Sequence, residues 1–206
     1  LVKKNDIKYL VYSQKQSNKY TKDLEKKFLS NSPIYNLYQA EWDDKTLQAQ
    51  SSEAFPLGLN SVFQDGPSSW DTNNKVLYFT RSTQSSRKQK TIHLDLYSWE
   101  FNDSQKQIAR HLPINIVGYA TVHPAVSSQK HRLYFASDRP GGFGGMDLYY
   151  VDLLGNESYG SPINLGPDIN TEADEVFPFA YRADYLFFSQ KNTDGNLSPK
   201  LAINTV

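Results

Sequence analysis

The sequence predicts an all-β protein: a β-propeller in the form of an open arc of about three to four four-stranded antiparallel blades. Three observations support this prediction: a repeated order of short apolar segments, a closing asparagine at constant spacing, and a composition rich in aromatic residues. The 206 residues include 14 Tyr and 11 Phe but only one Met. Aromatic side chains fit the pleated surface of a strand, so this usage favours β structure.

The strongest element of the repeat is an apolar segment that ends in a hydroxyl residue. It occurs four times, at residues 8–13, 75–80, 132–137 and 185–189. Each copy is short enough to be a buried strand, here called strand B. A second segment, strand C, contains Asn or Asp followed by Leu-Tyr and occurs at residues 35–38, 94–97 and 146–149.

Two further elements complete the repeat. Strand D leads to a closing asparagine at Asn60, Asn115 and Asn170, and these asparagines are 55 residues apart in both intervals. Strand A precedes strand B and contains a proline, at Pro67, Pro124 and Pro178. Four strands per unit of about 40–50 residues are typical of a propeller blade, which buries its faces against neighbouring blades. A β-sandwich also has many short strands, but it does not require one element order three times.

The repeat divides the chain into an incomplete unit at about residues 1–60, units at 61–115 and 116–170, and an incomplete unit at 171–206. The first unit is expected to have strands B, C and D but no room for strand A. The last is expected to have strand A at 176–180, strand B, a strand C at 201–206 and no strand D. Because both end units own a strand B, they cannot be halves of one blade, and we expect an open arc.

One stretch departs from the β pattern. Residues 19–29 carry Tyr20, Leu24 and Phe28 at helical spacing. This stretch lies in the B–C connection of the first unit, and we expect it to be a helical insertion on the surface.

Composition excludes several classes of function. The 22 basic residues balance 22 acidic ones, so no electrostatic footprint for nucleic acid or anionic lipid is expected. The absence of cysteine excludes disulfides, thiolate metal sites and thiol catalysis. No run of about 18 apolar residues occurs, so no transmembrane segment is expected. Residue Leu1 is not an initiator Met and no signal peptide is seen, so we expect a processed or excised chain.

No catalytic, cofactor or metal site is predicted. The histidines at positions 93, 111, 123 and 131 do not share a metal-ligand spacing. No nucleophile elbow of the Gly-x-Ser-x-Gly type occurs. His123 directly precedes Pro124 on an inner strand, which places it as a candidate for facing the channel.

The glycine-rich loop between strands B and C of the third unit has two interpretations. A phosphate-binding loop requires a following helix, whereas here a strand follows. We therefore predict a structural turn in which the glycines take positive φ and Asp147 binds Arg139 or backbone amides. The turn residues are Asp138, Arg139, Gly141, Gly142, Gly144, Gly145 and Asp147. The alternative is a cation site at Asp138 and Asp147, since carboxylates and loop carbonyls suit calcium.

Five residues are candidates for interaction with other molecules. Trp42 and Trp99 lie at the ends of C strands, where lateral contacts and core packing are both open interpretations. Glu172, Asp174 and Glu175 precede an inner strand. Paired carboxylates there would suit a glycosidase, but the other units offer no matching carboxylates, so a solvated rim is expected.

The third unit also resembles a known family. Ser137-Asp138-Arg139-Pro140-Gly141-Gly142, followed by Gly144-Gly145-Met146-Asp147-Leu148-Tyr149, resembles the WD-like (PD-type) β-propeller repeat in its Bacteroidetes version. The match is close over residues 118–190 and looser before them, where Arg81-Ser82-Thr83 replaces the Ser-Asp-Arg pattern and the glycine loop is missing. TolB-like propellers share the repeat more distantly.

The resemblance implies a location and a role. In that family the propeller often lies between tetratricopeptide repeats and an OmpA-like peptidoglycan-binding domain, as in PorE-type lipoproteins of the type IX secretion machinery. It implies a scaffold at the periplasmic face of the outer membrane, with protein partners in an envelope complex of the secretion or gliding type. Peptidoglycan would be bound through a further domain.

Two functions are therefore carried forward. The first is a non-catalytic protein-interaction module of the cell envelope. The alternative is a glycan-active propeller hydrolase or a carbohydrate-binding propeller. Three or more carboxylates converging in the axial channel would favour the hydrolase.

Overall fold

The structure is a computed structural model, and it describes residues 2–4, 7–15, 35–55, 59–60, 64–84, 92–101 and 108–203. These residues form four separate antiparallel sheets that follow one another along the chain. This arrangement confirms the predicted all-β fold. The helical insertion expected at residues 19–29 lies outside the described residues.

The first sheet, blade 1, has four strands in sequence order. They are β1 (Val2–Lys4), β2 (Ile7–Lys15), β3 (Tyr35–Asp43) and β4 (Gln48–Ala54). The prediction that this unit has no room for strand A was wrong. A three-residue strand is sufficient, because Val2 to Lys4 pair with Tyr9 to Ile7 at the inner edge of β2.

Blades 2 and 3 follow the same order from strand A to strand D. Blade 2 consists of β5 (Asp65–Asp71), β6 (Val76–Gln84), β7 (Ile92–Glu100) and β8 (Arg110–His111). Blade 3 consists of β9 (Thr121–Ser127), β10 (Arg132–Ser137), β11 (Asp147–Gly155), β12 (Ser158–Tyr159) and β13 (Ile163–Asn164). Both β12 and β13 pair with β11, so strand D of blade 3 is split into two short pieces.

Blade 4 has three described strands, β14 (Glu175–Tyr181), β15 (Tyr185–Lys191) and β16 (Leu197–Ile203). Its strand C begins at Leu197, four residues before the predicted start at Leu201. Residues 204–206, the end of the predicted strand, lie outside the described part of the chain.

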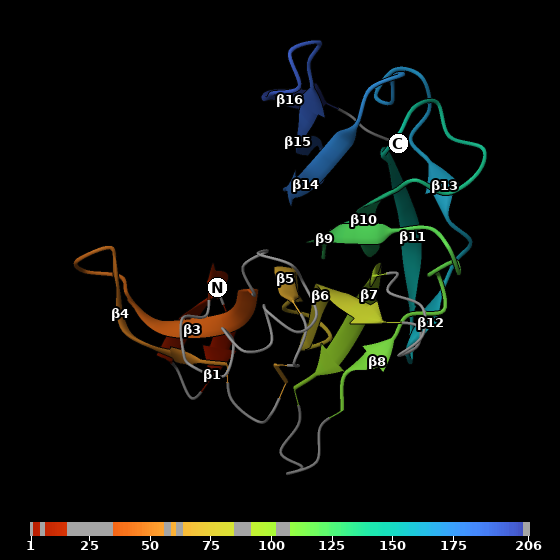
Figure 1. The fold of residues 1–206 in the computed structure, drawn as a ribbon. Helices are drawn as coiled ribbons and strands as arrows, with labels where there is room; N and C mark the ends of the chain where they lie inside the picture. Colours follow the sequence, from red (N-terminus) through yellow and green to blue (C-terminus); the bar gives the residue numbers. More distant parts are fainter. Residues whose placement is uncertain are drawn as a thin grey trace.

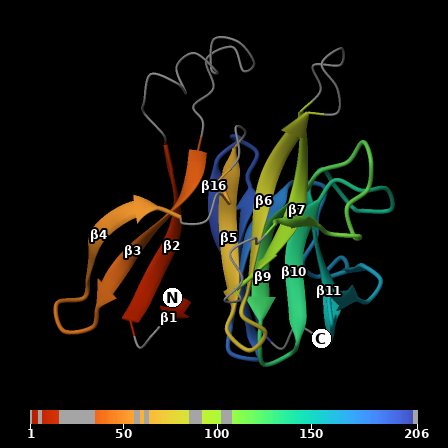
Figure 2. The same cartoon turned by 90° about the horizontal axis from the view of Figure 1, so that it is seen from below.

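The four blades are arranged around an arc with the A strands on its inner side (Figure 1). Strand β9 contacts β5 on one side and β14 on the other, so the inner strands of blades 2 to 4 are neighbours. Figure 2 shows β5 and β9 side by side and aligned along one direction. Within the described residues no strand pairing joins blade 4 to blade 1, as expected for an open arc.

Each blade packs on the next through one apolar cluster. Between blades 1 and 2, Leu37 of β3 packs with Leu77 and Phe79 of β6. The same Leu-x-Phe pair of strand B recurs as Leu133 and Phe135 in the cluster between blades 2 and 3. It recurs again as Leu186 and Phe188 between blades 3 and 4. The repeated strand B thus provides the inter-blade core, because a single blade cannot bury both of its faces.

The closing asparagines bind the backbone of their own strand C. The amide nitrogen of Leu148 donates to Oδ1 of Asn170 (2.8 Å), and Nδ2 of Asn170 donates to the carbonyl oxygen of Leu148 (2.9 Å). Asn115 makes the same pair with Leu96, at 2.9 and 2.8 Å. Asn60 does so with Leu37, at 2.8 and 2.9 Å. The carboxamide replaces a neighbouring peptide group, which explains why the spacing of these residues marks the repeat.

No helix among the described residues is long and apolar enough to cross a membrane.

Candidate functional site

The inner strands carry a recurring distortion. Each of β5, β9 and β14 has a register shift against its strand B. One residue at each shift has positive φ: Gly66 at 113°, His123 at 56° and Phe177 at 54°. Glycine adopts this region without strain, whereas His and Phe do so at a cost of about 1–2 kcal/mol. Strain of this kind is concentrated at functional sites.

The two strained residues contact each other on the axial side of blades 3 and 4. The rings of His123 and Phe177 stack with centroids 3.8 Å apart and planes 23° apart. The Phe177 N–H donates to Nδ1 of His123 (3.4 Å). In the neutral imidazole the proton is therefore on Nε2, which leaves that nitrogen as a donor for another group.

A cavity of about 350 Å³ lies beside this stack, and 300–1,000 Å³ is the usual range for small-molecule sites. Residues of blades 1 to 4 line it, including Trp70, His123 and Phe177. The three prolines predicted for strand A also line it: Pro67, Pro124 and Pro178. We call this surface the axial face. Sequence reasoning identified His123 but not Phe177, although both aromatic residues directly precede the strand-A proline.

Burial lowers the pKa of His123 to about 4, so its imidazole is neutral at pH 7. Together with the prolines and Trp70, this neutral ring gives the axial face an aromatic and uncharged character at its centre.

Acid should destabilise the protein through His123. Because the folded pKa of about 4 lies below the unfolded value of about 6.5, protonation favours the unfolded state. Above pH 6.5 His123 does not lower the free energy of unfolding. As pH falls toward 4, its protonation in the unfolded state lowers that free energy by an amount on the order of 1–3 kcal/mol. Urea unfolding at pH 7 and pH 4.5 should show a smaller loss in His123→Asn than in the natural chain. Equal losses in both proteins would contradict this role.

Three carboxylates near the inner strands are engaged by other groups of the chain. Asp65 is fully buried and pairs with Nε of Arg81 at 2.5 Å. Glu175 is fully buried and accepts from Thr171 Oγ1 at 2.6 Å and from Gln190 Nε2 at 2.8 Å. Asp71 is also buried and accepts from the amide nitrogen of Asn73 at 3.0 Å. Each carboxylate therefore stabilises a strand end.

The expected solvated acidic rim is only partly correct. Glu172 is exposed, but Asp174 is half-buried, accepts from the Met146 amide nitrogen at 3.0 Å and pairs with Lys191 Nζ at 3.1 Å. Glu175 is buried because Thr171 and Gln190 supply its hydrogen bonds. Asp174 therefore joins blade 3 to blade 4, and the three acids do not form one solvated patch.

The described residues contain no group of three or more His, Asp or Glu that could hold a metal ion. His111 lies 3.3 Å from Oδ2 of Asp95, and its ring stands edge-on to Tyr97. His93 is half-buried on β7, and His131 is exposed at the turn before β10.

The glycine-rich turn is organised by Asp147. Its two carboxylate oxygens accept from the amide nitrogens of Phe143 (2.7 Å) and Gly144 (3.1 Å), and from Nδ2 of Asn164 (2.8 Å). Asp138 is exposed and accepts from the Ala120 amide nitrogen at 2.6 Å, so the two aspartates have separate partners.

The reason predicted for the glycines was wrong at three positions. Gly142, Gly144 and Gly145 do not have positive φ, whereas Gly141 does, at 89°. A Cβ on Gly144 would lie 2.3 Å from the carbonyl oxygens of Thr171 and Ala173. A Cβ on Gly142 would lie 2.5 Å from Oδ2 of Asp147. Close approach of other groups, and not backbone angle, excludes side chains at these positions.

An arginine side chain occupies the same place in blade 2 and in blade 3, although Arg81 and Arg139 stand at different positions of the repeat. The Arg139 guanidinium lies 4.9 Å from the Phe135 ring and 5.0 Å from the Tyr149 ring, and it donates to the carbonyl oxygen of Ile114 (3.1 Å). Arg81 lies in the same way between the rings of Phe79 and Tyr97 and donates to the Leu59 carbonyl oxygen. Ile114 and Leu59 each precede a closing asparagine, so each arginine joins its blade to the one before.

The two candidate tryptophans differ in accessibility. Trp99 is 1% exposed and packs between blades 1 and 2 in an edge-on contact with Phe55. It therefore cannot serve a lateral contact, and the core-packing interpretation applies. Trp42 is half-buried near the end of β3.

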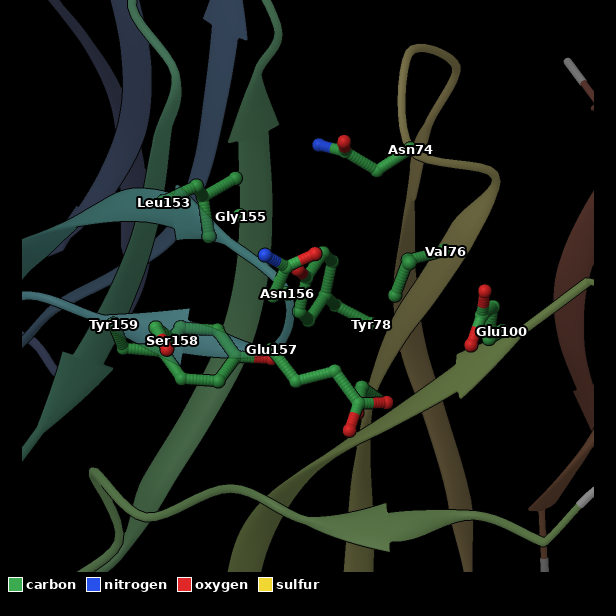
Figure 3. A pocket seen from close by; sticks show the side chains of 11 residues that line it. Asn74, Val76, Tyr78, Glu100, Leu153, Gly155, Asn156, Glu157, Ser158 and Tyr159 are labelled. Atoms are coloured by element: carbon green, nitrogen blue, oxygen red, sulfur yellow. The ribbon is translucent and has the colours of Figure 1, made fainter.

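A second cavity of about 390 Å³ opens between blades 2 and 3. In Figure 3 Tyr78 lies near the middle of the view and Tyr159 to its left, with Glu157 below, Glu100 on the right and Asn74 above. The two tyrosine rings stand edge-on at 6.5 Å. Burial raises the pKa of Tyr159, whose hydroxyl shares hydrogen bonds with Tyr78 and Ser98. Hydroxyls, amides and carboxylates thus surround a partly aromatic floor.

Comparisons with known proteins show likeness at the level of fold. Protein-family models and curated protein sequences gave no match. An α-L-arabinofuranosidase from Lactobacillus brevis is similar in structure, with a TM-score of 0.60 and 12% identity, over 97% of this chain and 69% of that one. A protein of unknown function from Dyadobacter fermentans is similar with a TM-score of 0.52 and 9% identity, over 95% of this chain and 57% of that one. TolB from Acinetobacter baumannii gives a TM-score of 0.48 and 13% identity, over 82% of this chain and 37% of that one.

The four-bladed arc and its likeness to the arabinofuranosidase define the chain as a β-propeller fold. The chain spans 37% of the TolB structure, which is less than two thirds of its length. At these identities the likeness identifies the fold and leaves activity, substrate and partner open.

Proposed function

We propose that the protein is a non-catalytic scaffold of a cell-envelope complex that binds protein partners on its axial face. The observation that carries this proposal is the stack of His123 on Phe177 at two strained positions beside a cavity lined by three prolines and Trp70. Rigid aromatic anchors in a preformed hollow are typical of the centres of protein interfaces.

The chemistry of the axial face suits a peptide segment of the partner. Aromatic and proline side chains offer apolar contact at low cost in conformational entropy, and the neutral His123 ring offers one Nε2–H to a backbone carbonyl. Support for the envelope comes from the PD-type resemblance over residues 118–190. Within that setting, the periplasmic face of the outer membrane and a complex of the type IX secretion or gliding type are the proposed context.

The experiment uses the chain as bait for detergent-solubilised envelope proteins, followed by quantitative mass spectrometry. In the test protein, His123→Asn and Phe177→Asn remove both rings and keep positive φ accessible, since Asn tolerates that region. Captured partner should fall about tenfold or more. Phe143→Asn, on an exposed loop, is the matched control and should capture normally. Equal capture by the test protein and the control would contradict the proposal.

The cleft of Figure 3 favours carbohydrate binding as a second candidate function. Its polar groups include the hydroxyl of Ser158 and the carboxylates of Glu100 and Glu157. Glu157 forms an ion pair with Arg110. Hydroxyls and carboxylates around tyrosine rings can hydrogen-bond a neutral sugar, whereas the two glutamates disfavour an anion.

Saturation-transfer NMR with maltose, cellobiose and chitobiose tests this second function. A disaccharide that occupies the cleft should give a signal that Glu157→Gln and Ser158→Ala reduce, while Asp168→Asn in another cavity leaves it unchanged. No signal from any of the three sugars would count against it. Release of reducing sugar from arabinan by the natural chain would instead favour the hydrolase alternative.

A further inference from the structure

The outward side of blade 4, away from blade 3, is apolar and exposed. Phe179 of β14 faces Phe187 of β15, and Phe187 faces Leu201 of β16. Their exposed fractions are 60%, 41% and 47%. Tyr181, Tyr185 and Ile203 form a second exposed row beside them. We call these six residues the forward face of blade 4.

The forward face is the counterpart of a buried surface in blade 3. The register of β9, β10 and β11 places Ala125, Tyr134 and Tyr150 in the row that corresponds to Phe179, Phe187 and Leu201. Those three residues are only 4%, 2% and 8% exposed, because blade 4 covers them. In blade 2 the corresponding aromatic residue is Tyr78, 4% exposed beneath blade 3.

The covering surface has the same chemistry in all three interfaces. It is the Leu-x-Phe pair of the next strand B, namely Leu77 with Phe79, Leu133 with Phe135, and Leu186 with Phe188. All six side chains are buried. Apolar burial drives the stacking of blades. The forward face of blade 4 has the apolar surface that is buried in the three internal interfaces, but here it is left uncovered.

We propose that the forward face of blade 4 is covered by a further blade of the same repeat, whose strand B presents a Leu-x-Phe pair to Phe179 and Phe187. Phe179 also lines the cavity of the axial face, whereas Phe187 and Leu201 do not, so a test at Phe187 separates the two proposals.

A second copy of the chain is the other occupant to consider, since its blade 1 also ends the arc. At the corresponding positions of strand B, blade 1 has Leu10 and Tyr12. The Tyr12 hydroxyl contacts Oγ of Ser52 at an exposed position, whereas Phe occupies this place in blades 2, 3 and 4. Blade 1 thus presents a polar Tyr12–Ser52 pair where each internal interface presents the apolar Phe of a Leu-x-Phe pair. A further blade therefore fits the forward face better than a second copy.

Photocrosslinking in the producing cells tests this inference. Benzoylphenylalanine replaces Phe187, and the joined peptides are identified by mass spectrometry. The expected partner peptide contains an apolar strand with a Leu-x-Phe pair and comes from outside residues 1–206. Benzoylphenylalanine at Tyr159 is the positive control, which must join blade 3 to blade 2 because that ring lies beside Tyr78. The same probe at Phe143, 47% exposed on a loop, controls for non-specific capture.

Three results would overturn the inference while the Tyr159 control succeeds. They are a peptide from a second copy of residues 1–206, a peptide without the Leu-x-Phe pair, and no product beyond that seen at Phe143. A substitution at Phe187 leaves the three internal interfaces intact, so each result bears on the forward face itself.

Discussion

Replacing Gly144 with alanine is expected to destabilise the protein by about 3 kcal/mol or more, measured by urea unfolding. The new Cβ would lie 2.3 Å from the carbonyl oxygens of Thr171 and Ala173 and 2.6 Å from the carbonyl carbon of Glu172. These are backbone atoms, and they cannot move aside easily. The Gly145 amide nitrogen donates to Ala173 O at 3.2 Å, and the Glu175 amide nitrogen donates to Met146 O at 2.6 Å.

Gly141→Ala in the same turn is the matched control. Gly141 has a φ of 89°, and a Cβ there would meet nothing within 4 Å. Its replacement should cost only the strain of positive φ, about 1–2 kcal/mol. If the two substitutions cost the same, close packing of the turn on residues 171–173 is not the reason for Gly144.

Replacing Asn170 with alanine is expected to cost about 2–4 kcal/mol, seen as a lower midpoint of unfolding. Asn170 is 1% exposed, and its carboxamide binds both the amide nitrogen and the carbonyl oxygen of Leu148. The Leu148 carbonyl also accepts from the Leu165 amide nitrogen at 3.0 Å, so it keeps a partner in the variant. The buried Leu148 N–H does not, and an unsatisfied buried donor accounts for most of the loss.

Two further variants define the cause. Asn115→Ala removes the same pair from Leu96 in blade 2 and should cost a similar amount. Asn170→Asp keeps an acceptor for the Leu148 N–H but places a buried carboxylate oxygen against the acceptors Leu148 O and Asn164 Oδ1, so at pH 7 it should be at least as destabilising as alanine. A loss below 1 kcal/mol for both alanine variants would show that these asparagines do not close the blades.

The repeat made the fold predictable because it records contacts that recur. Strand B must bury Leu and Phe in every interface, so its apolar pattern is visible at Leu77, Leu133 and Leu186 alike. The spacing of Asn60, Asn115 and Asn170 is visible for the same reason. The role of these asparagines was not predictable from the sequence. That a side chain replaces a peptide group is seen only when the position of the partner strand is known.

Other features depend on contacts between blades that local sequence does not contain. The sequence pattern treats Arg81 as a departure from the Ser-Asp-Arg motif, yet its guanidinium takes the same place as that of Arg139. A long flexible side chain reaches one position from two backbone sites. Glu175 looked solvent-exposed because Gln190, its neighbour on β15, is distant in the sequence.

The candidate site was only partly visible for a related reason. Positive φ at His123 and Phe177 arises from the register shifts of β9 and β14, and neither residue type predicts it. The shared signal was an aromatic residue directly before the strand-A proline, in His123-Pro124 and Phe177-Pro178.

Hydrogen–deuterium exchange of the purified 206-residue chain tests the open arc most directly. Strands β6, β7, β10 and β11 lie in blades 2 and 3, whose two faces are both covered, so their amides should be the most protected. The amides of β15 and β16 should exchange faster, because the forward face of blade 4 is open to solvent. Uniform protection of all four blades, with β15 and β16 as slow as β10 and β11, would contradict the open arc and indicate a closed ring.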